Sequence, residues 1–193
     1  MIRPATERDL PEILSIYAPY VENTTVSFEY DVPCLKTFTQ RFYAYTAQFP
    51  WLVYEEDGVI LGYAYASAPF ERAAYRWCAE PSVYLREEAR GKGIAAKLYT
   101  VLEAILKEQG YRVLYALVTS ENAASIRFHE KMGYFIRAEL PDCGYKFGRW
   151  LGLLWLEKEL NFVGSPSAFP KSCLSIVQDA ERFTNFLDSL SLS

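Results

Sequence analysis

Residues 82–99, SVYLREEARGKGIAAKLY, join a strand to a helix through a glycine-containing turn. The β-prone residues from 77 to 85 give way to helical spacing, and the helix is expected to end at Gly110. Four apolar residues share its buried face: Ile94, Leu98, Val101 and Ile105. The amides of its first turn and the helix dipole would suit an anion such as a pyrophosphate. The same turn is also compatible with a helix start that needs only tight packing.

The remaining sequence alternates strand and helix patterns around this unit. Turns are expected at Asp57-Gly58 and at Asp142-Cys143-Gly144, and Thr6 with Asp9 resembles a capping box. The pattern predicts an α+β domain over residues 1–160. Its expected strands are 1–3, 51–54, 59–66, 77–85, 113–118, 134–140 and 151–159, and its expected helices begin near residues 10, 31, 94 and 122.

Residues 161–193 differ in composition and form a predicted C-terminal extension. Ser165-Pro166-Ser167 is linker-like, and an amphipathic helix is expected after it. Its apolar stripe comprises Ile176, Ala180, Phe183, Leu187 and Leu190. This stripe needs a partner, which is either the domain itself or a second subunit.

Composition excludes several classes of protein. A net charge of −4 and 51% hydrophobic residues describe a globular chain without the broad basic face of a nucleic-acid-binding protein. No apolar run approaches the roughly 20 residues that span a bilayer, and the first residues lack a secretory signal pattern. Four separated cysteines and one histidine, without a CxxC or HExxH motif, indicate no metal centre. We therefore expect a cytoplasmic protein without membrane or nucleic-acid partners.

Two motifs carry a family resemblance. Arg90-x-x-Gly93-x-Ala95 resembles the acyl-CoA signature of the GCN5-related N-acetyltransferases (GNAT superfamily). About 30 residues later, the segment from Asn122 through Ser125 and His129 to Gly133-Tyr134 resembles the second signature of that family. The resemblance implies the acyl-CoA N-acyltransferase fold, a three-layer arrangement in which helices flank a mixed, mostly antiparallel sheet. Its central strands splay apart and admit the pantetheine of acetyl-CoA.

Within this family the chain is most similar to the phosphinothricin and methionine sulfoximine N-acetyltransferases. The segments that carry this similarity are 25–28, 50–53, 75–80, 82–84 and 144–150. Phe147, Arg149 and Gly152 depart from residues that some members carry. These departures leave the exact substrate open, and the extension has no counterpart in the resemblance.

The resemblance also implies a site for acetyl-CoA. Backbone amides near Val83 and Leu85 would polarise the thioester carbonyl, and the turn before the helix would hold the pyrophosphate. The implied cofactor-binding residues are Val83, Tyr84, Leu85, Arg90, Gly91, Lys92, Gly93, Ile94, Ala95, Ala96, Asn122 and Ser125. No metal is implied.

Glu80 and His129 are the implied catalytic residues. An ammonium must lose a proton before its nitrogen attacks a thioester, and Glu80 is placed to accept it. His129 follows Ser125 by four residues and stands where the wider family has a tyrosine, so it is a candidate acid for the CoA thiolate. Each residue also has a structural interpretation, an ion pair with Arg76 or another arginine for Glu80 and a structural or merely solvated helix residue for His129.

Candidate substrate-binding residues come from the same segments. Arg72 could hold an oxyanion through two hydrogen bonds. The candidate walls are Phe28, Tyr30, Tyr75, Tyr84, Lys146 and Trp150, each of which could instead belong to the core or the surface.

The sequence thus predicts acetyl transfer from acetyl-CoA to the amine of a small amino-acid-like substrate, by direct attack in a ternary complex. Two alternatives remain: acetylation of a protein N-terminus or another amine, and a CoA-binding module without turnover. The resemblance further implies a homodimer, with an interface made by residues 1–160 and the extension as an accessory.

Overall fold

The computed structural model describes residues 1–160, 164, 168–177 and 179–190. The described residues form one sheet in the order β1-β2-β3-β4-β5-β7-β6, in which only β4 and β5 are parallel neighbours. This arrangement confirms the predicted mixed, mostly antiparallel sheet. The strands are β1 (Ile2–Pro4), β2 (Trp51–Glu56), β3 (Val59–Ser67), β4 (Cys78–Leu85), β5 (Val113–Thr119), β6 (Phe135–Lys146) and β7 (Arg149–Glu159).

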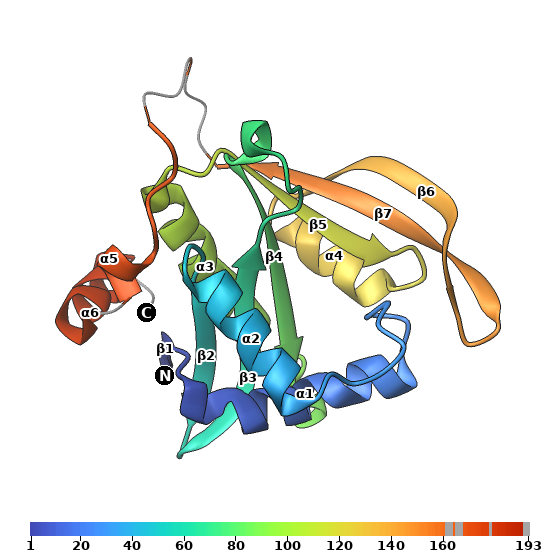
Figure 1. Ribbon diagram of the computed structural model, residues 1–193, viewed down its shortest axis with the longest axis horizontal. Helices are drawn as coiled ribbons and strands as arrows, with labels where there is room; N and C mark the ends of the chain where they lie inside the picture. Colours follow the sequence, from blue (N-terminus) through green and yellow to red (C-terminus); the bar gives the residue numbers. More distant parts are fainter. Residues whose placement is uncertain (161–163, 165–167, 178, 191–193) are drawn as a thin grey trace.

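Helices cover both faces of the sheet, which gives three layers (Figure 1). The helices α1 and α2 pack on one face of β2 and β3, whereas α3 packs on the other face of these strands and α4 packs against β5. The helices are α1 (Leu10–Asn23), α2 (Leu35–Thr46), α3 (Ile94–Gln109), α4 (Ala123–Lys131), α5 (Leu174–Val177) and α6 (Ala180–Ser189).

Strand alternation separates the two cores. Trp51 and Val53 pack toward α1 and α2, and Leu52 between them packs toward α3. The α1–α2 side is rich in stacked aromatic rings, such as Trp51 on Tyr65 with ring centroids 4.4 Å apart. Many of the tyrosines therefore serve as packing residues, because stacked and edge-to-face aromatic pairs stabilise a core.

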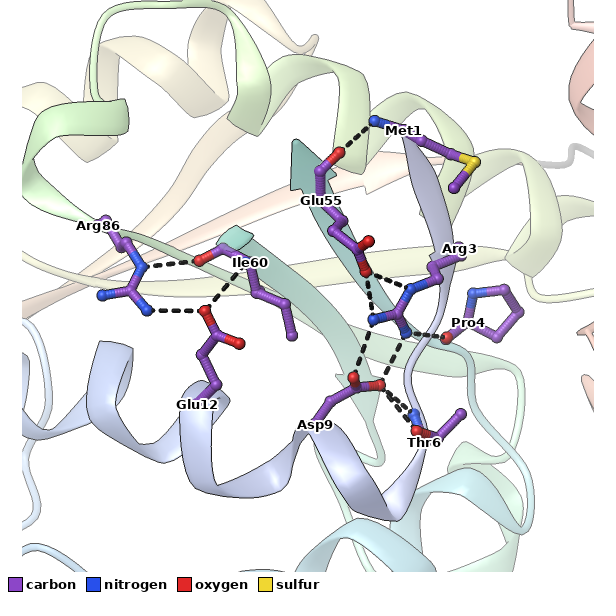
Figure 2. Close-up of polar contacts among 9 residues, drawn as sticks. All are labelled: Met1, Arg3, Pro4, Thr6, Asp9, Glu12, Glu55, Ile60 and Arg86. Carbon is purple, nitrogen blue, oxygen red and sulfur yellow. Dashed lines mark hydrogen bonds and ion pairs between the residues drawn. The ribbon is translucent and has the colours of Figure 1, made fainter. Parts of the chain in front are cut away.

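Polar contacts fix the start of the chain and the base of β4 (Figure 2). Arg3 donates to both carboxylate oxygens of Asp9, at 2.8 and 2.9 Å, and to Glu55. Asp9 also accepts from the amide and hydroxyl of Thr6, which confirms the capping box. Arg86, directly after β4, donates to the Ile60 carbonyl and to Glu12 of α1. These contacts hold Arg86 in place, and with it the start of the turn that follows β4.

The hairpin between β6 and β7 was predicted at the wrong turn. Asp142-Cys143-Gly144 lies inside β6, where the pairing register shifts, and the hairpin turn is at Phe147-Gly148. Both of these residues have positive φ, +51° and +74°, as a tight two-residue hairpin requires. The Asp142-Cys143-Gly144 segment instead marks an irregularity within β6. It brings Gly144 against the ring of Phe28, and a Cβ added to Gly144 would lie 2.3 Å from the nearest ring atom.

The extension packs on its own domain. Phe183 and Cys173 belong to the same buried cluster as α3, and Ile176, Leu187 and Leu190 pack against that cluster. The predicted stripe is divided between α5 and α6 rather than carried by one helix. The expected linker, Ser165-Pro166-Ser167, lies outside the described residues. None of the helices in the described part of the chain is both long and apolar enough to cross a membrane.

Candidate active site

The site begins where β4 and β5 separate. These strands pair through Cys78 with Val113 and Ala79 with Leu114, and beyond that point a cavity lies between them. Pro81 stands at the start of this gap and has no N–H to continue a ladder. The residues that line the cavity are Val26, Glu80, Pro81, Ser82, Val83, Tyr84, Tyr99, Ala116, Leu117, Val118, Thr119, Asn122, Ser125 and His129. Six of the predicted site residues are therefore brought together here, namely Glu80, Val83, Tyr84, Asn122, Ser125 and His129.

Glu80 faces this gap in a poorly solvated position. Burial raises the pKa of its carboxyl group to about 7, because the charged form is poorly solvated there. Arg76, the alternative partner, instead holds its guanidinium 4.9 Å from the centre of the Phe169 ring. Within the residues that the structure describes, Glu80 has no ion-pair partner. A carboxylate with this pKa can take up and release a proton near neutral pH.

His129 is buried, with 5% of its surface exposed, and both ring nitrogens have partners. Nδ1 lies 2.8 Å from the carbonyl oxygen of Ser125, so Nδ1 carries the hydrogen in the neutral ring. Nε2 lies 3.1 Å from the hydroxyl of Tyr99, which is also 3.1 Å from the Pro81 carbonyl oxygen. Burial lowers the pKa of the His129 ring, which therefore favours the neutral form.

The Tyr99 hydroxyl can bond in two directions. When His129 is neutral, the hydroxyl donates to Nε2. When Nε2 is protonated, the ring donates to Tyr99, and the hydroxyl donates to Pro81. His129 can therefore gain a proton without losing a hydrogen bond. The sequence analysis missed Tyr99, although it belongs to the helix of the first motif and its ring meets His129 at a centroid distance of 5.5 Å.

The two predicted backbone amides differ. Arg86 donates its amide to Leu61 of β3, and alternation along the antiparallel pair then turns Val83 and Leu85 away from β3. The Leu85 amide donates to the Tyr20 hydroxyl at 3.2 Å and is thus already engaged within the protein. Val83 lines the gap and keeps the predicted orientation.

A groove of about 380 Å³ lies at the foot of the gap, beside the start of α3. Gly91 and Gly93 both have φ of +76°, and a Cβ on either would meet no atom within 4 Å, so the backbone faces open space. Its lining includes the predicted Leu85, Gly91, Gly93, Ile94, Ala95 and Ala96. Arg90 instead lies over the Tyr20 ring at 5.2 Å, and both Arg90 and Lys92 are exposed beside the groove.

Two further cations line this groove. Arg127 and Lys131 are four residues apart on α4 and share one helix face. The sequence analysis overlooked them, although their spacing after the Asn122 motif was a visible signal. Asn122 itself accepts from the Ser125 amide at 3.1 Å and caps α4. The groove therefore combines helix amides with positive charge, a fitting environment for a pyrophosphate.

Arg72 and Tyr75 line a second cavity of about 310 Å³, formed by the loop between β3 and β4. Cys78 also lines it, and Cys78 and Glu80 lie on the same face of β4 because side chains alternate along a strand. The lining of the second cavity thus combines a β4 residue two positions before Glu80 with Phe49 and Tyr111 of the buried cluster that contains α3.

Three predicted wall residues lie elsewhere. Phe28 packs against Gly144, and the hydroxyl of Tyr30 donates to the Tyr145 carbonyl. Trp150 is 61% exposed and meets the ring of Tyr145 edge to face. These rings gather on the β6–β7 hairpin and line neither the Glu80 cavity nor the Arg72 cavity. Only Val26 of the loop before α2 lines the gap.

Lys146 is a structural residue, which corrects its prediction as a substrate wall. It is 3% exposed, and its ammonium donates to the carbonyls of Val21, Thr24 and Ser27 at 2.7, 2.9 and 2.7 Å. All three ammonium hydrogens are therefore used within the protein. Lys146 closes the end of α1 and fixes the loop that brings Val26 to the gap.

A family model of the acetyltransferase (GNAT) domain matches residues 2–155. With the splayed sheet and the glycine turn at its foot, this match defines the class: the chain belongs to the GNAT family and is an N-acetyltransferase. The predicted fold and enzyme class are thereby confirmed.

Individual GNAT proteins are also similar to this chain. The L-methionine sulfoximine/L-methionine sulfone acetyltransferase of Pseudomonas paraeruginosa is 40% identical over 83% of this chain and 94% of its own length. A phosphinothricin N-acetyltransferase of Alcaligenes faecalis is 39% identical, over 83% of this chain and 82% of its own. The crystal structure of a phosphinothricin acetyltransferase from Sinorhizobium meliloti, in complex with acetyl-CoA, has a TM-score of 0.82 and 33% identity, over 89% of this chain and 92% of that one.

Replacing Lys146 with Met should destabilise the fold. The change leaves three carbonyls without their donor, and a buried acceptor left unsatisfied costs about 1–3 kcal/mol; because the cost of burying the ammonium is removed at the same time, a net loss of about 2–5 kcal/mol in the free energy of unfolding is expected. Urea denaturation followed by fluorescence measures it. Lys36→Met, on an exposed face of α2, is the matched control and should stay within about 0.5 kcal/mol of wild type. Equal stability of the two variants would contradict the structural role.

Proposed function

We propose that the protein transfers the acetyl group of acetyl-CoA to the amine of a small amino-acid-like substrate of the phosphinothricin, methionine sulfoximine or methionine sulfone class. The observation that carries the proposal is Glu80, whose pKa is raised to about 7 and which faces a gap that ends in a glycine-lined groove. The relatives named for such substrates support the substrate class.

The groove and the gap suit different parts of acetyl-CoA. The pyrophosphate would lie on the amides at the start of α3, where Gly91 and Gly93 leave room, with Arg127 and Lys131 nearby. The pantetheine would enter between β4 and β5. The Val83 amide would then donate to the thioester carbonyl and stabilise the charge that develops on its oxygen.

Transfer proceeds by direct attack. Glu80 accepts a proton from the substrate ammonium, and the freed nitrogen attacks the thioester carbon. As the carbon–nitrogen bond forms and the carbon–sulfur bond breaks, the nitrogen releases its second proton to water and the CoA thiolate leaves. Once Nε2 of the His129 ring has taken up a proton from solvent, that proton passes to the oxygen of Tyr99 while the hydroxyl proton of Tyr99 moves to the sulfur, and the ring returns to its favoured neutral form. His129 thus acts through Tyr99.

Glu80→Gln should lower kcat/KM for the amine by about 10²- to 10⁴-fold and leave acetyl-CoA affinity unchanged, because only the proton acceptor is lost. In wild type, kcat/KM should rise with pH through about 7, since Glu80 must be ionised to act, and this rise should be absent in the variant. Release of free CoA thiol across a pH series measures both. Glu56→Gln, at an exposed position, is the control. An unchanged profile in Glu80→Gln would remove Glu80 from the mechanism.

Gly93→Val should weaken CoA binding by at least about tenfold, or 1.4 kcal/mol, because the side chain fills the space proposed for the pyrophosphate. Gly58→Val is a matched control. Gly58 has nearly the same φ, +77°, and equally open surroundings, but it lies in the β2–β3 turn. Calorimetric titration with CoA should show a loss in the first variant only. Equal affinities in two folded variants would refute the pyrophosphate site.

We also propose a homodimer formed through β6 and β7. β6 is one of the two edge strands of the sheet, its residues 135–143 are all exposed, and the hairpin extends beyond the helices (Figure 1). Exposed apolar side chains are concentrated there: Phe135, Ile136, Leu140, Tyr145, Phe147 and Trp150. Such an edge favours pairing with another chain. The extension, whose stripe is covered by its own domain, is then dispensable for this contact.

Light scattering should give a molar mass twice the 22.2 kDa of one chain. Ile136→Glu should shift the protein toward the monomer, since it places a charge in the proposed interface. Val59→Glu, at an exposed apolar position on β3, should leave the mass unchanged. A wild-type mass of one chain would contradict the dimer.

A further inference from the structure

The C-terminal extension lies beyond the region that the family model matches, yet it is firmly seated. The side-chain amides of Gln48 and Gln109 donate to the Lys171 carbonyl at 3.1 and 2.6 Å, and the Lys171 amide donates to Gln109 at 2.8 Å. Cys173, two residues later, is buried. The segment is thereby fixed against the ends of α2 and α3.

This seat places Phe169 against the loop between β3 and β4. The Trp77 indole N–H donates to the Ala168 carbonyl at 3.2 Å, and the Trp77 and Phe169 ring centroids are 5.2 Å apart. The guanidinium of Arg76 lies 4.9 Å from the Phe169 ring centre, a cation–π distance. The extension therefore contacts the loop that carries Arg72 and Tyr75.

The second cavity lies between these two segments. Phe70, Tyr75 and Phe169 provide aromatic surface on its walls, while Arg72 and Arg76 provide positive charge. Glu71 is the one carboxylate in its lining, so the lining is net positive. A volume of about 310 Å³ suits one small molecule and not a folded protein surface.

We propose that the extension forms one wall of the acceptor pocket and that Phe169 is a specificity residue. The pocket would select amino acids with a second, tetrahedral anionic head, whose oxygens bind the guanidinium groups while the carbon chain packs on Phe169. Cys78 lines this pocket, and Glu80 follows two residues later on the same face of β4, so the substrate amine would point along β4 toward the proton acceptor. This assignment rests on the proposed N-acetylation.

Phe169→Ala should raise the KM for phosphinothricin about tenfold, since both a wall and the support of Arg76 are lost, with kcat and the KM for acetyl-CoA nearly unchanged. Methionine sulfone, whose head is uncharged, should be affected less. Phe169→Tyr, which keeps the ring, should behave as wild type. Phe186→Ala is the matched control, because Phe186 belongs to the same extension but packs against the core. It should change stability and not the KM.

A second readout needs no turnover. In a Cys34→Ser, Cys143→Ser background, alkylation of Cys78 by N-ethylmaleimide, read by mass spectrometry, should be slowed by phosphinothricin and accelerated by Phe169→Ala. One outcome would keep this pocket and reject the proposed function: phosphinothricin protects Cys78 in the wild type but not in Phe169→Ala, and the wild type acetylates no amino acid. Turnover with unchanged KM and unchanged Cys78 protection in Phe169→Ala would reject the wall and keep the function.

Discussion

The separation of β4 from β5 is the constraint on which the site depends. A parallel pair that continued past Ala79 would use its backbone groups within the sheet, whereas here they face a cavity. Pro81 has no N–H to donate where the two strands diverge, and its carbonyl oxygen accepts a hydrogen bond from the Tyr99 hydroxyl. Arg86, held by Glu12 and by β3, fixes the other end of β4. An open region can persist in the sheet because both of its ends are secured.

Burial at this gap acts on two groups in opposite senses. It raises the pKa of Glu80 to about 7 and lowers that of the His129 ring, because the charged form of each is poorly solvated there. Glu80 is therefore suited to accept a proton near neutral pH, and a protonated His129 ring to release one. Positive side chains lie at either end, Arg127 and Lys131 at the groove and Arg72 in the second cavity, although the whole chain is acidic. Local placement, not net charge, therefore prepares the site for anions.

The sequence was most informative where function depends on neighbouring residues. The strand, glycine turn and helix of residues 82–99 form as predicted, because turn chemistry and periodicity are local. Residue roles that depend on contacts with residues far away in the sequence could not be predicted from such local patterns. Lys146 meets carbonyls more than a hundred residues earlier, and the Leu85 amide meets Tyr20 of α1. The last hairpin contains two possible turns, Asp142-Cys143-Gly144 and Phe147-Gly148, and only the pairing of β6 with β7 shows which of them joins the strands.

The extension lies outside the region that the family model matches, yet it shares the buried core of that domain. Its stripe had two possible partners in the sequence, and the structure joins Phe183 and Cys173 to the buried cluster that contains Leu98 of α3. The extension and the groove at the start of α3 are thus held by one core, although they lie at different ends of β4. Changes at Phe169 would alter the cavity near Cys78 without touching the glycine turn. Under the proposed assignment of that cavity to the acceptor, a chain segment outside the family domain adjusts which amine is accepted while the acetyl-transfer machinery remains the same.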